Sequence, residues 1–336
     1  MTILENISLK QYNTFGIEAT ARYFVEINSK EELPKLFDEN KNSDVFILGG
    51  GSNLLFTQDI DKIVLKISIK GKELIEESDN SILLKIGAGE NWHTLVEWCV
   101  QNNYAGIENL ALIPGIVGAA PIQNIGAYGV EIKDVLVSLE WFDFETKKSK
   151  IFSNDECEFG YRDSIFKREL KGCGIISAVT LQLRKSTRAL HTSYSDVLLE
   201  LGANADTAKI YDVFNTVCAI RTRKLPNPSE IGNAGSFFKN PIISSEQYAE
   251  VKNNFPEIPS YNQHNSKVKI PAAWLIEQSG WKGFRRGDVG VYPRQALVLV
   301  NYGEASGEEI IALAREIQTS VQSKFGIVID MEVNVL

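Results

Sequence analysis

The spacing of apolar residues in the first third of the chain predicts strands and helices in alternation. Residues 24–27 have the composition of a short strand, and residues 45–48 form a continuous apolar run, typical of a strand buried on both faces. Residues 63–67 and 82–86 repeat the strand pattern. Residues 92–103 have helical spacing, and the side chains expected to face the core are Leu95, Val96, Cys99 and Val100.

The middle of the chain returns to strands before a candidate domain boundary. Strand patterns cover residues 135–144 and 174–184, and a polar helical pattern covers residues 205–224. Pro226 and Pro228 follow directly, and this pair of prolines predicts the start of a last domain.

The C-terminal region predicts one helix followed by one strand. Ser306 and Glu309 have the spacing of a capping box at the start of the helix, and Gly326 ends it. The apolar stripe of this helix consists of Ile310, Leu313, Ala314, Ile317 and Val321. The strand predicted over residues 327–335 alternates, with one face formed by Ile329, Met331, Val333 and Val335 and the other by Asp330, Glu332 and Asn334.

Composition and charge narrow the class of protein. The 336 residues are 44% hydrophobic and 23% charged, which is ordinary for a globular protein of two or three domains. A net charge of −8 argues against a general nucleic-acid or membrane-surface binder, although a pocket can still be locally basic. No apolar stretch approaches the roughly 20 residues that span a bilayer, and the first ten residues lack a signal-peptide pattern. We expect a soluble protein without membrane insertion.

The cysteines indicate neither a disulfide framework nor a metal site. The four of them are far apart, include no CxxC pair, and do not cluster with the three histidines. Reduced, buried thiols in a cytoplasmic protein are the simplest interpretation.

The first candidate for chemistry is the glycine loop at residues 49–53, which directly follows the strand at 45–48. Backbone N–H groups turned inward at such a loop can cradle an anion. The loop lacks the GxGxxG of a Rossmann fold and the GxxxxGK[ST] of a P-loop kinase. Taken alone, it fits a tight turn without a ligand as well as it fits a phosphate site.

A second stretch, residues 109–129, is rich in glycine, alanine and proline, and Gly87 and Gly89 precede it. Such segments expose backbone rather than side chains, and several of them together suggest a long ligand lying against bare backbone. The pyrophosphate of a dinucleotide fits this description. The alternative is a set of turns at a crowded sheet edge.

Seven segments spread along the chain carry a resemblance. They are residues 13–16, 48–55, 113–129, 159–164, 232–240, 273–278 and 295–299. In this order they resemble the UDP-N-acetylenolpyruvoylglucosamine reductase family, in its subtype with a tyrosine loop, and the resemblance covers nearly the whole chain.

The resemblance implies an α/β (α+β) fold. A two-lobed FAD-binding module of the vanillyl-alcohol-oxidase type would be followed by a smaller α/β substrate-binding domain. The expected boundaries are residues 1–70 and 71–223 for the two FAD-binding lobes, 224–326 for the substrate domain, and 327–336 for a C-terminal strand that returns to the active site.

The resemblance also implies bound FAD, with NADPH as the hydride donor. The expected FAD contacts are Leu48, Gly49, Gly50, Gly51, Ser52, Asn53, Pro114, Gly115, Val117, Gly118, Ala119, Gln123, Asn124, Gly126, Ala127 and Tyr128. The implied reaction reduces UDP-N-acetylglucosamine enolpyruvate to UDP-N-acetylmuramate, a precursor of peptidoglycan.

Three residues match the family's catalytic positions. Ser236 would donate the proton, Arg162 would stabilise the enolate-like charge, and Glu332 would assist with that charge. Without the family, a turn serine is the simpler interpretation of Ser236, and an ion pair with Asp163 or another acid is the simpler interpretation of Arg162. Glu332 could then be a solvated glutamate at a sheet edge.

Contacts to the substrate are expected from Tyr194, Lys224, Asn240 and Gln295. We expect a monomer that binds no nucleic acid. Two other functions stay open at this point: another FAD-dependent oxidoreductase of the same fold, or a non-redox protein that binds nucleotide sugars.

Overall fold

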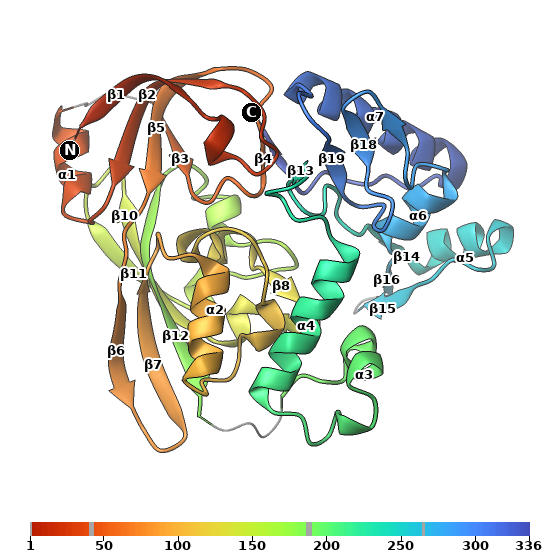
Figure 1. Cartoon of the computed structure of the whole chain (residues 1–336), viewed down its shortest axis with the longest axis horizontal. Coiled ribbons are helices and arrows are strands. Elements are labelled where there is room, and N and C mark those ends of the chain that lie inside the picture. Colours follow the sequence, from red (N-terminus) through yellow and green to blue (C-terminus); the bar gives the residue numbers. More distant parts are fainter. Residues whose placement is uncertain (1, 40–43, 186–189, 264–265) are drawn as a thin grey trace. The chain divides into compact units, whose positions relative to one another are not determined.

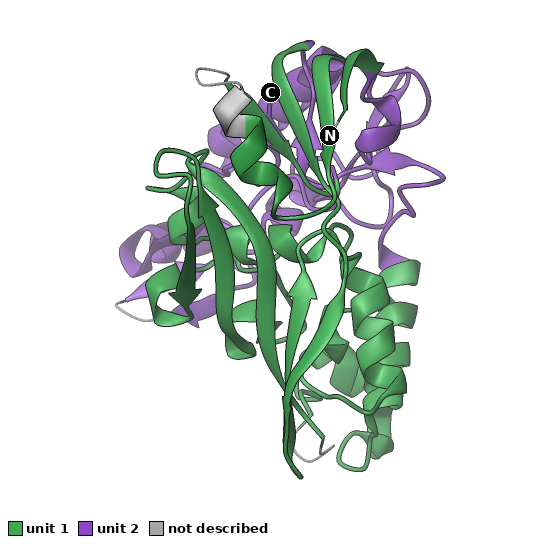
Figure 2. Cartoon of the chain, turned by 90° about the vertical axis from the view of Figure 1, so that its left-hand side faces the viewer, with its two compact units in different colours: residues 1–7, 21–50, 60–223 green, residues 8–20, 51–59, 224–336 purple. Residues whose placement is uncertain are grey.

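The computed structural model describes residues 2–39, 44–185, 190–263 and 266–336 (Figure 1). Contacts along the chain divide it into two units, each assembled from separate stretches of sequence (Figure 2). Unit 1 contains residues 1–7, 21–50 and 60–223, and unit 2 contains residues 8–20, 51–59 and 224–336. The expected ranges of the two lobes, the substrate domain and the C-terminal strand remain predictions.

The first sheet of unit 1 contains the strands predicted at the start of the chain. Its strand order is β1 (Ile3–Ser8), β2 (Thr20–Ile27), β5 (Ile60–Ile67) and β3 (Val45–Leu48). β5 pairs in parallel with both β2 and β3, and α1 (Glu32–Glu39) connects β2 to β3. The strand prediction for 45–48 is confirmed, but burial on both faces is wrong for its first three residues. β3 lies at the sheet edge, and only Leu48 is fully buried.

The second sheet of unit 1 is antiparallel and carries the larger core. Its strand order is β11 (Ser149–Ser153), β10 (Leu136–Asp143), β12 (Gly174–Arg184), β7 (Ser81–Gly87) and β6 (Lys72–Glu77). Helices α2 (Trp92–Gln101) and α4 (Ile210–Lys224) bury their apolar faces in the same core. The predicted inward face of α2 is confirmed, because Leu95, Val96, Cys99 and Val100 are all buried.

The glycine- and proline-rich stretch at 109–129 forms short turns in place of long elements. It contains η2 (Glu108–Leu110), η3 (Val117–Ala119), η4 (Pro121–Gln123) and the hairpin of β8 (Gly126–Ala127) with β9 (Val130–Glu131). A single 3₁₀ turn pairs only a few backbone N–H and C=O groups with one another, so the other backbone groups of the stretch need partners outside the turn. The remaining short elements of unit 1 are η5 (Ile132–Asp134), η6 (Asp155–Cys157), η7 (Ile165–Lys167), α3 (Ser195–Leu201) and η8 (Gly202–Asn204).

Unit 2 contains two small antiparallel sheets. One has the order β13 (Gly232–Asn233), β19 (Leu299–Asn301), β18 (Val289–Val291) and β17 (Arg285–Arg286). The other has the order β14 (Ile242–Ser244), β16 (Lys267–Lys269) and β15 (Tyr261–Gln263). Its helices are η1 (Lys10–Tyr12), α5 (Ser245–Asn254), α6 (Ala272–Gln278) and α7 (Gly307–Phe325).

The predicted ends and apolar stripe of the last helix are confirmed. Ser306 and Glu309 form a reciprocal capping box, and Gly326 ends α7 with a φ of 66°. The whole predicted stripe is buried: Ile310, Leu313, Ala314, Ile317 and Val321.

The strand predicted over 327–335 is only partly regular. Ile327, Ile329 and Val333 are buried as the alternation requires, but Val335 is 40% exposed. Regular pairing is limited to β20 (Asn334–Val335), which lies parallel to β4 (Leu54–Leu55). Upstream, a single bridge joins Met331 to Phe238. The regular strand pairing is short because the C-terminal segment pairs first with Phe238, at Met331, and then with β4, at β20.

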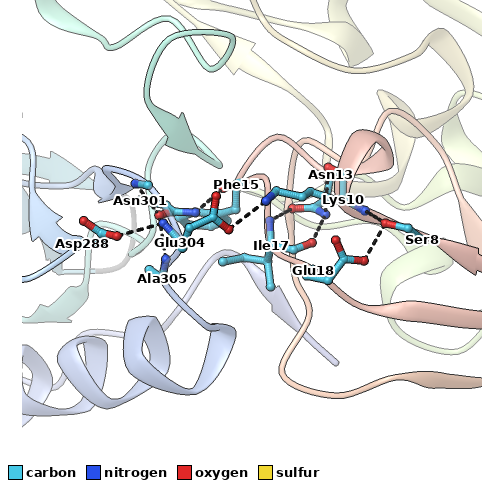
Figure 3. A network of polar contacts seen from close by, with 11 residues as sticks. Ser8, Lys10, Asn13, Phe15, Ile17, Glu18, Asp288, Asn301, Glu304 and Ala305 are labelled. Carbon is cyan, nitrogen blue, oxygen red and sulfur yellow. Dashed lines mark hydrogen bonds and ion pairs between the residues drawn. The ribbon is translucent and has the colours of Figure 1, made fainter.

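Residues 8–20 are built into unit 2 by two buried asparagines (Figure 3). The Nδ2 of Asn13 donates to the carbonyls of Leu9 and Ile17, both at 2.8 Å, and its Oδ1 accepts from the Ile17 N–H at 3.0 Å. Asn301 on β19 donates to the Phe15 carbonyl at 2.9 Å. The resemblance at residues 13–16 therefore has a structural basis: this turn joins the N-terminal segment to the C-terminal sheet.

Replacing Asn13 by Asp should destabilise unit 2. The substitution keeps the size but removes both N–H donors, so two buried carbonyls would face a carboxylate, at a cost of about 3 kcal/mol. The melting temperature of the purified protein, compared with wild type, measures this. Ser8→Ala is the control, because the Ser8 hydroxyl bonds Glu18 at the exposed surface and its loss should change stability little. Equal melting temperatures for Asn13→Asp and wild type would contradict the structural role.

Candidate active site

Two stretches of bare backbone meet in unit 1. A Cβ added at Gly50 would lie 2.6 Å from the Cα of Gly115 and 3.3 Å from the nitrogen of Ile116. Real Cβ atoms do not approach backbone so closely, so only glycine fits at position 50. The glycine loop and the start of the 113–129 stretch, which are far apart in sequence, therefore touch through their main chains.

This contact leaves several N–H groups unused. Within the described part of the chain, the amides of Gly50, Gly115 and Ile116 donate to no protein acceptor. Unused backbone donors at a place where two loops meet can bind an anion. The predicted FAD contacts Gly50 and Gly115 thus lie together, with Leu48 and Gly49 leading into the loop and Pro114 beside Gly115.

Two lysines, one on β5 and one just after it, bind the carbonyls of these glycine segments. The Nζ of Lys66 on β5 donates to the Gly49 carbonyl, and the Nζ of Lys70 donates to the Gly89 carbonyl. Burial lowers the pKa of Lys66. Because the C=O and N–H of a trans peptide point in opposite directions, the bond to Gly49 turns the Gly50 N–H away from the lysine. Nothing in the sequence marks Lys66 as part of this site, since a lysine in a strand normally faces solvent.

The segment after Ile116 is held by tight packing. A Cβ at Gly118 would lie 2.5 Å from the Cβ of Ala88, and the Gly118 N–H donates to the Ala88 carbonyl at 2.8 Å. The Val117 and Ala119 amides donate to Glu90 and Ile116. The backbone N–H groups of Val117, Gly118 and Ala119, all predicted FAD contacts, are thus bonded within the protein. A ligand could therefore contact these residues only through van der Waals packing.

Asn124 has a structural role in the predicted contact segment. It is fully buried with a φ of 44°, and its Nδ2 donates to Glu131 and to the Gly160 carbonyl at 3.1 and 3.0 Å. Its Oδ1 accepts from the Lys133 amide. This side chain fixes the turn between Gln123 and the β8–β9 hairpin that carries Gly126 and Ala127.

Arg162 is attached to the same hairpin. Its Nη2 donates to the Gly126 carbonyl at 2.7 Å, and its backbone has a left-handed φ of 54°, which is uncommon for a residue with a long side chain. Asp163, suggested by the sequence as its ion-pair partner, is instead paired with Arg168. A strained backbone that directs a guanidinium toward a loop fits a functional residue.

Tyr128, at the end of the stretch, has contacts from two directions. The Tyr194 ring, which precedes α3, packs against its ring edge at a centroid distance of 5.4 Å. The Arg221 guanidinium of α4 hydrogen-bonds the Tyr128 side chain and donates to the Leu112 carbonyl at 3.2 Å. Burial raises the pKa of Tyr128 and lowers that of Arg221. Arg221 thereby connects the two ends of the 113–127 loop, a role that its basic sequence context (residues 221–224) does not reveal.

In unit 2 the structure brings Ser236 and Glu332 close in space. Ser236 is exposed, and its hydroxyl makes no hydrogen bond within the described residues. Phe237 and Phe238, both buried, anchor the segment that follows it. The Glu332 amide donates to the Phe237 carbonyl at 2.8 Å, so the half-buried Glu332 lies alongside the serine loop. Within the described residues, the Ser236 hydroxyl thus lacks the local hydrogen bond to the backbone that a turn serine would make.

The glycine loop continues into unit 2 at Gly51, followed by Ser52 and Asn53. Gly51 has a φ of 65°, and a Cβ there would lie 1.9 Å from the Tyr12 carbonyl oxygen. The Nδ2 of Asn53 donates to the Glu332 carbonyl at 3.3 Å. Asn53, predicted as a cofactor contact, thus also holds the backbone of a predicted catalytic residue.

Two of the predicted substrate contacts have their amides oriented by the protein. The Oδ1 of Asn240 accepts from the Ala272 amide at the start of α6, at 2.9 Å, and the Oε1 of Gln295 accepts from the Leu297 amide at 3.3 Å. Lys224 ends α4. Tyr194 and Arg162 belong to unit 1, whereas Lys224, Asn240 and Gln295 belong to unit 2.

The described residues contain no group of three or more His, Cys, Asp or Glu side chains placed to hold a metal ion. None of the helices in the same residues has both the length and the apolar character that crossing a bilayer requires.

Two family models match this chain. That of an FAD-binding domain covers residues 21–146, which includes the Gly50–Gly115 contact, and that of the C-terminal domain of UDP-N-acetylenolpyruvoylglucosamine reductase covers residues 227–336, which includes Ser236 and Glu332. The first match confirms FAD as the expected cofactor.

Curated relatives match over the full length. UDP-N-acetylenolpyruvoylglucosamine reductase of Flavobacterium johnsoniae is 52% identical, and that of Amoebophilus asiaticus 49%, each over 100% of both chains. The Pseudomonas putida enzyme is 46% identical over 98% of both. The crystal structure of the Thermus caldophilus reductase matches with a TM-score of 0.69 at 24% identity, over 100% of this chain and 99% of that one. With the FAD-binding domain match, this likeness confirms the predicted fold class. The chain belongs to the UDP-N-acetylenolpyruvoylglucosamine reductase family.

Proposed function

We propose that this protein catalyses the FAD-mediated, NADPH-dependent reduction of UDP-N-acetylglucosamine enolpyruvate to UDP-N-acetylmuramate. The main support is the direct backbone contact between two glycine-containing loops, at Gly50 and Gly115, in a chain that belongs to this family. We further propose that it acts as a monomer in the cytoplasm. The match to the C-terminal domain of the reductase and the full-length relatives favour this reaction over the two alternatives, another oxidoreductase of the same fold and a non-redox nucleotide-sugar binder.

The residues at the loop contact fit an FAD diphosphate. Three unused amides, at Gly50, Gly115 and Ile116, offer donors to phosphate oxygens, and the nearby Lys66 adds positive charge. The bare backbone lets a ligand approach to van der Waals distance. When bound, FAD supplies the hydride that no side chain can provide.

Ser236 is suited to supply the proton. Reduction of the enol ether adds a hydride to one alkene carbon and a proton to the carbon beside the carboxylate. The Ser236 hydroxyl is exposed and unengaged, and Gly235, with a φ of 70°, leaves room next to it. A serine is a weak acid, but a carbanion beside a carboxylate is a strong enough base to take its proton.

Arg162 and Glu332 would act on the charge that develops during this transfer. The positively charged Arg162 guanidinium is oriented by its hydrogen bond to the Gly126 carbonyl. That charge would stabilise the enolate-like carboxylate of the substrate. Glu332 would lie on the serine side, where its backbone is fixed next to Phe237.

The diphosphate of the substrate would be bound by Lys224, Asn240 and Gln295. Since the side-chain oxygens of Asn240 and Gln295 already accept backbone N–H groups, their NH₂ groups are the donors left for phosphate oxygens. Tyr194, 44% exposed beside Tyr128, would cover the bound substrate.

Ser236→Ala should separate the two half-reactions. We expect flavin reduction by NADPH within about twofold of wild type, and reoxidation by the enolpyruvyl sugar nucleotide slower by roughly a thousandfold, since a general acid contributes that much. Stopped-flow absorbance of the flavin measures both rates. Equal loss in both would show that Ser236 is not the proton donor.

Gly50→Ala should abolish tight FAD binding. The added methyl would overlap the Gly115 backbone, and we expect the dissociation constant to rise roughly a hundredfold. Gly49→Ala, at another expected FAD contact, is the comparison, because its Cβ would meet side chains rather than backbone, namely Ile116 at 3.3 Å and Ala119 at 3.5 Å. Fluorescence titration of the apoprotein with FAD compares them. A Gly50→Ala variant that binds FAD as tightly as wild type would place FAD elsewhere.

A further inference from the structure

The C-terminal strand of unit 2 lies along the part of the glycine loop that follows Gly50. The Leu336 amide donates to the Leu55 carbonyl at 3.0 Å, and the Thr57 amide donates to the Leu336 carbonyl at 2.8 Å. β20 pairs with β4 in parallel just before these two bonds. The residues directly after the proposed diphosphate site are thus paired with the residues directly after Glu332.

The backbone of Glu332 is held on both sides. Its N–H donates to the Phe237 carbonyl at 2.8 Å, next to Ser236. Its C=O accepts from the Nδ2 of Asn53 at 3.3 Å. Of these two bonds, the second comes from a side chain, so a substitution can remove it.

Asn53 is itself fixed by the same strand. Its carbonyl accepts from both the backbone N–H and the Nδ2 of Asn334, each at 3.1 Å. Together with the bond to Glu332, these contacts enclose Val333, which is buried. Upstream, Gly51 is locked against Tyr12, and its carbonyl accepts from the Thr14 amide at 3.1 Å. Asn53 therefore lies on a rigid turn rather than on a freely moving loop.

We propose that Asn53 is a positioning residue for Glu332, and that it links occupancy of the cofactor loop to the placement of that carboxylate. FAD bound at the Gly50 amide restrains the loop, the loop restrains Asn53, and Asn53 holds the Glu332 carbonyl. Misplacement of a catalytic group by about 1 Å can reduce the rate strongly. This inference rests on the role of Glu332 in the proposed function.

The alternative is that Asn53 serves only as an FAD contact. In that case its replacement would weaken FAD binding and leave the reaction of the FAD-saturated enzyme unchanged. If Asn53 positions Glu332, the loss must persist at saturating FAD and must fall on the half-reaction that uses the carboxylate.

The test compares Asn53→Asp with wild type at saturating FAD. Aspartate keeps the size but cannot donate to the Glu332 carbonyl. We expect reduction by NADPH within about twofold and reoxidation by the enolpyruvyl sugar nucleotide slower by roughly tenfold, the effect of one lost hydrogen bond. The pH profile of reoxidation should also shift. Asn334→Ala, which removes a bond to Asn53 but none to Glu332, should stay within about threefold.

Hydrogen exchange gives a readout that does not depend on turnover. Residues 330–336 should exchange faster in Asn53→Asp than in wild type, and faster in wild-type apoprotein than in the FAD-loaded protein. Unchanged exchange together with an unchanged reoxidation rate would overturn the proposal, and so would an effect on FAD affinity alone.

Glu332→Gln separates the two hypotheses. If it slows reoxidation while Asn53→Asp does not, the proposed function stands and only the positioning role fails. If Glu332→Gln itself leaves reoxidation unchanged, the assignment of Glu332 fails, and the positioning role fails with it.

Discussion

The contact between the Gly50 and Gly115 backbones is the constraint on which the rest of unit 1 depends. A side chain at position 50 would separate the two loops, and the unused amides around them would no longer converge. Two sheets place these loops. β3 delivers Gly50 directly, and β7 leads to Ala88 and Glu90, which hold the segment after Ile116. The sheets thus act as a frame for a site made almost entirely of main chain.

Three cationic side chains bring positive charge to the glycine-rich stretches by binding backbone carbonyls. Lys66, Arg162 and Arg221 each donate to a backbone carbonyl in or beside the glycine-rich stretches, namely those of Gly49, Gly126 and Leu112. A carbonyl is neutral, so these bonds orient the cations without cancelling their charge. A chain with a net charge of −8 can in this way present a locally positive site to an anionic dinucleotide and its substrate.

Unit 2 shows how distant segments are combined at one place. Side-chain amides bind two distant segments to C-terminal residues: Asn301 donates to the Phe15 carbonyl of the N-terminal turn, and Asn53 of the glycine loop donates to the Glu332 carbonyl. Asn13 holds the N-terminal turn itself together. An amide can donate and accept at once, so each asparagine satisfies several backbone groups that irregular segments leave unpaired. This explains why the serine loop and Glu332 lie together without a long regular strand between them.

The sequence by itself determined the regular elements and the family. The positions of apolar residues located β3, β12, α2 and α7, because an element that packs against a core needs apolar residues at the spacing of its buried side. The capping box and Gly326 marked the ends of α7. It also indicated that the glycine-rich stretches expose backbone. Only the tertiary structure decided which backbones meet, which cations turn toward them, and that Asn53 reaches Glu332 across 279 positions of sequence. The physical reason is that such contacts are made by backbone groups and single polar side chains, and neither has a periodicity that a sequence can reveal.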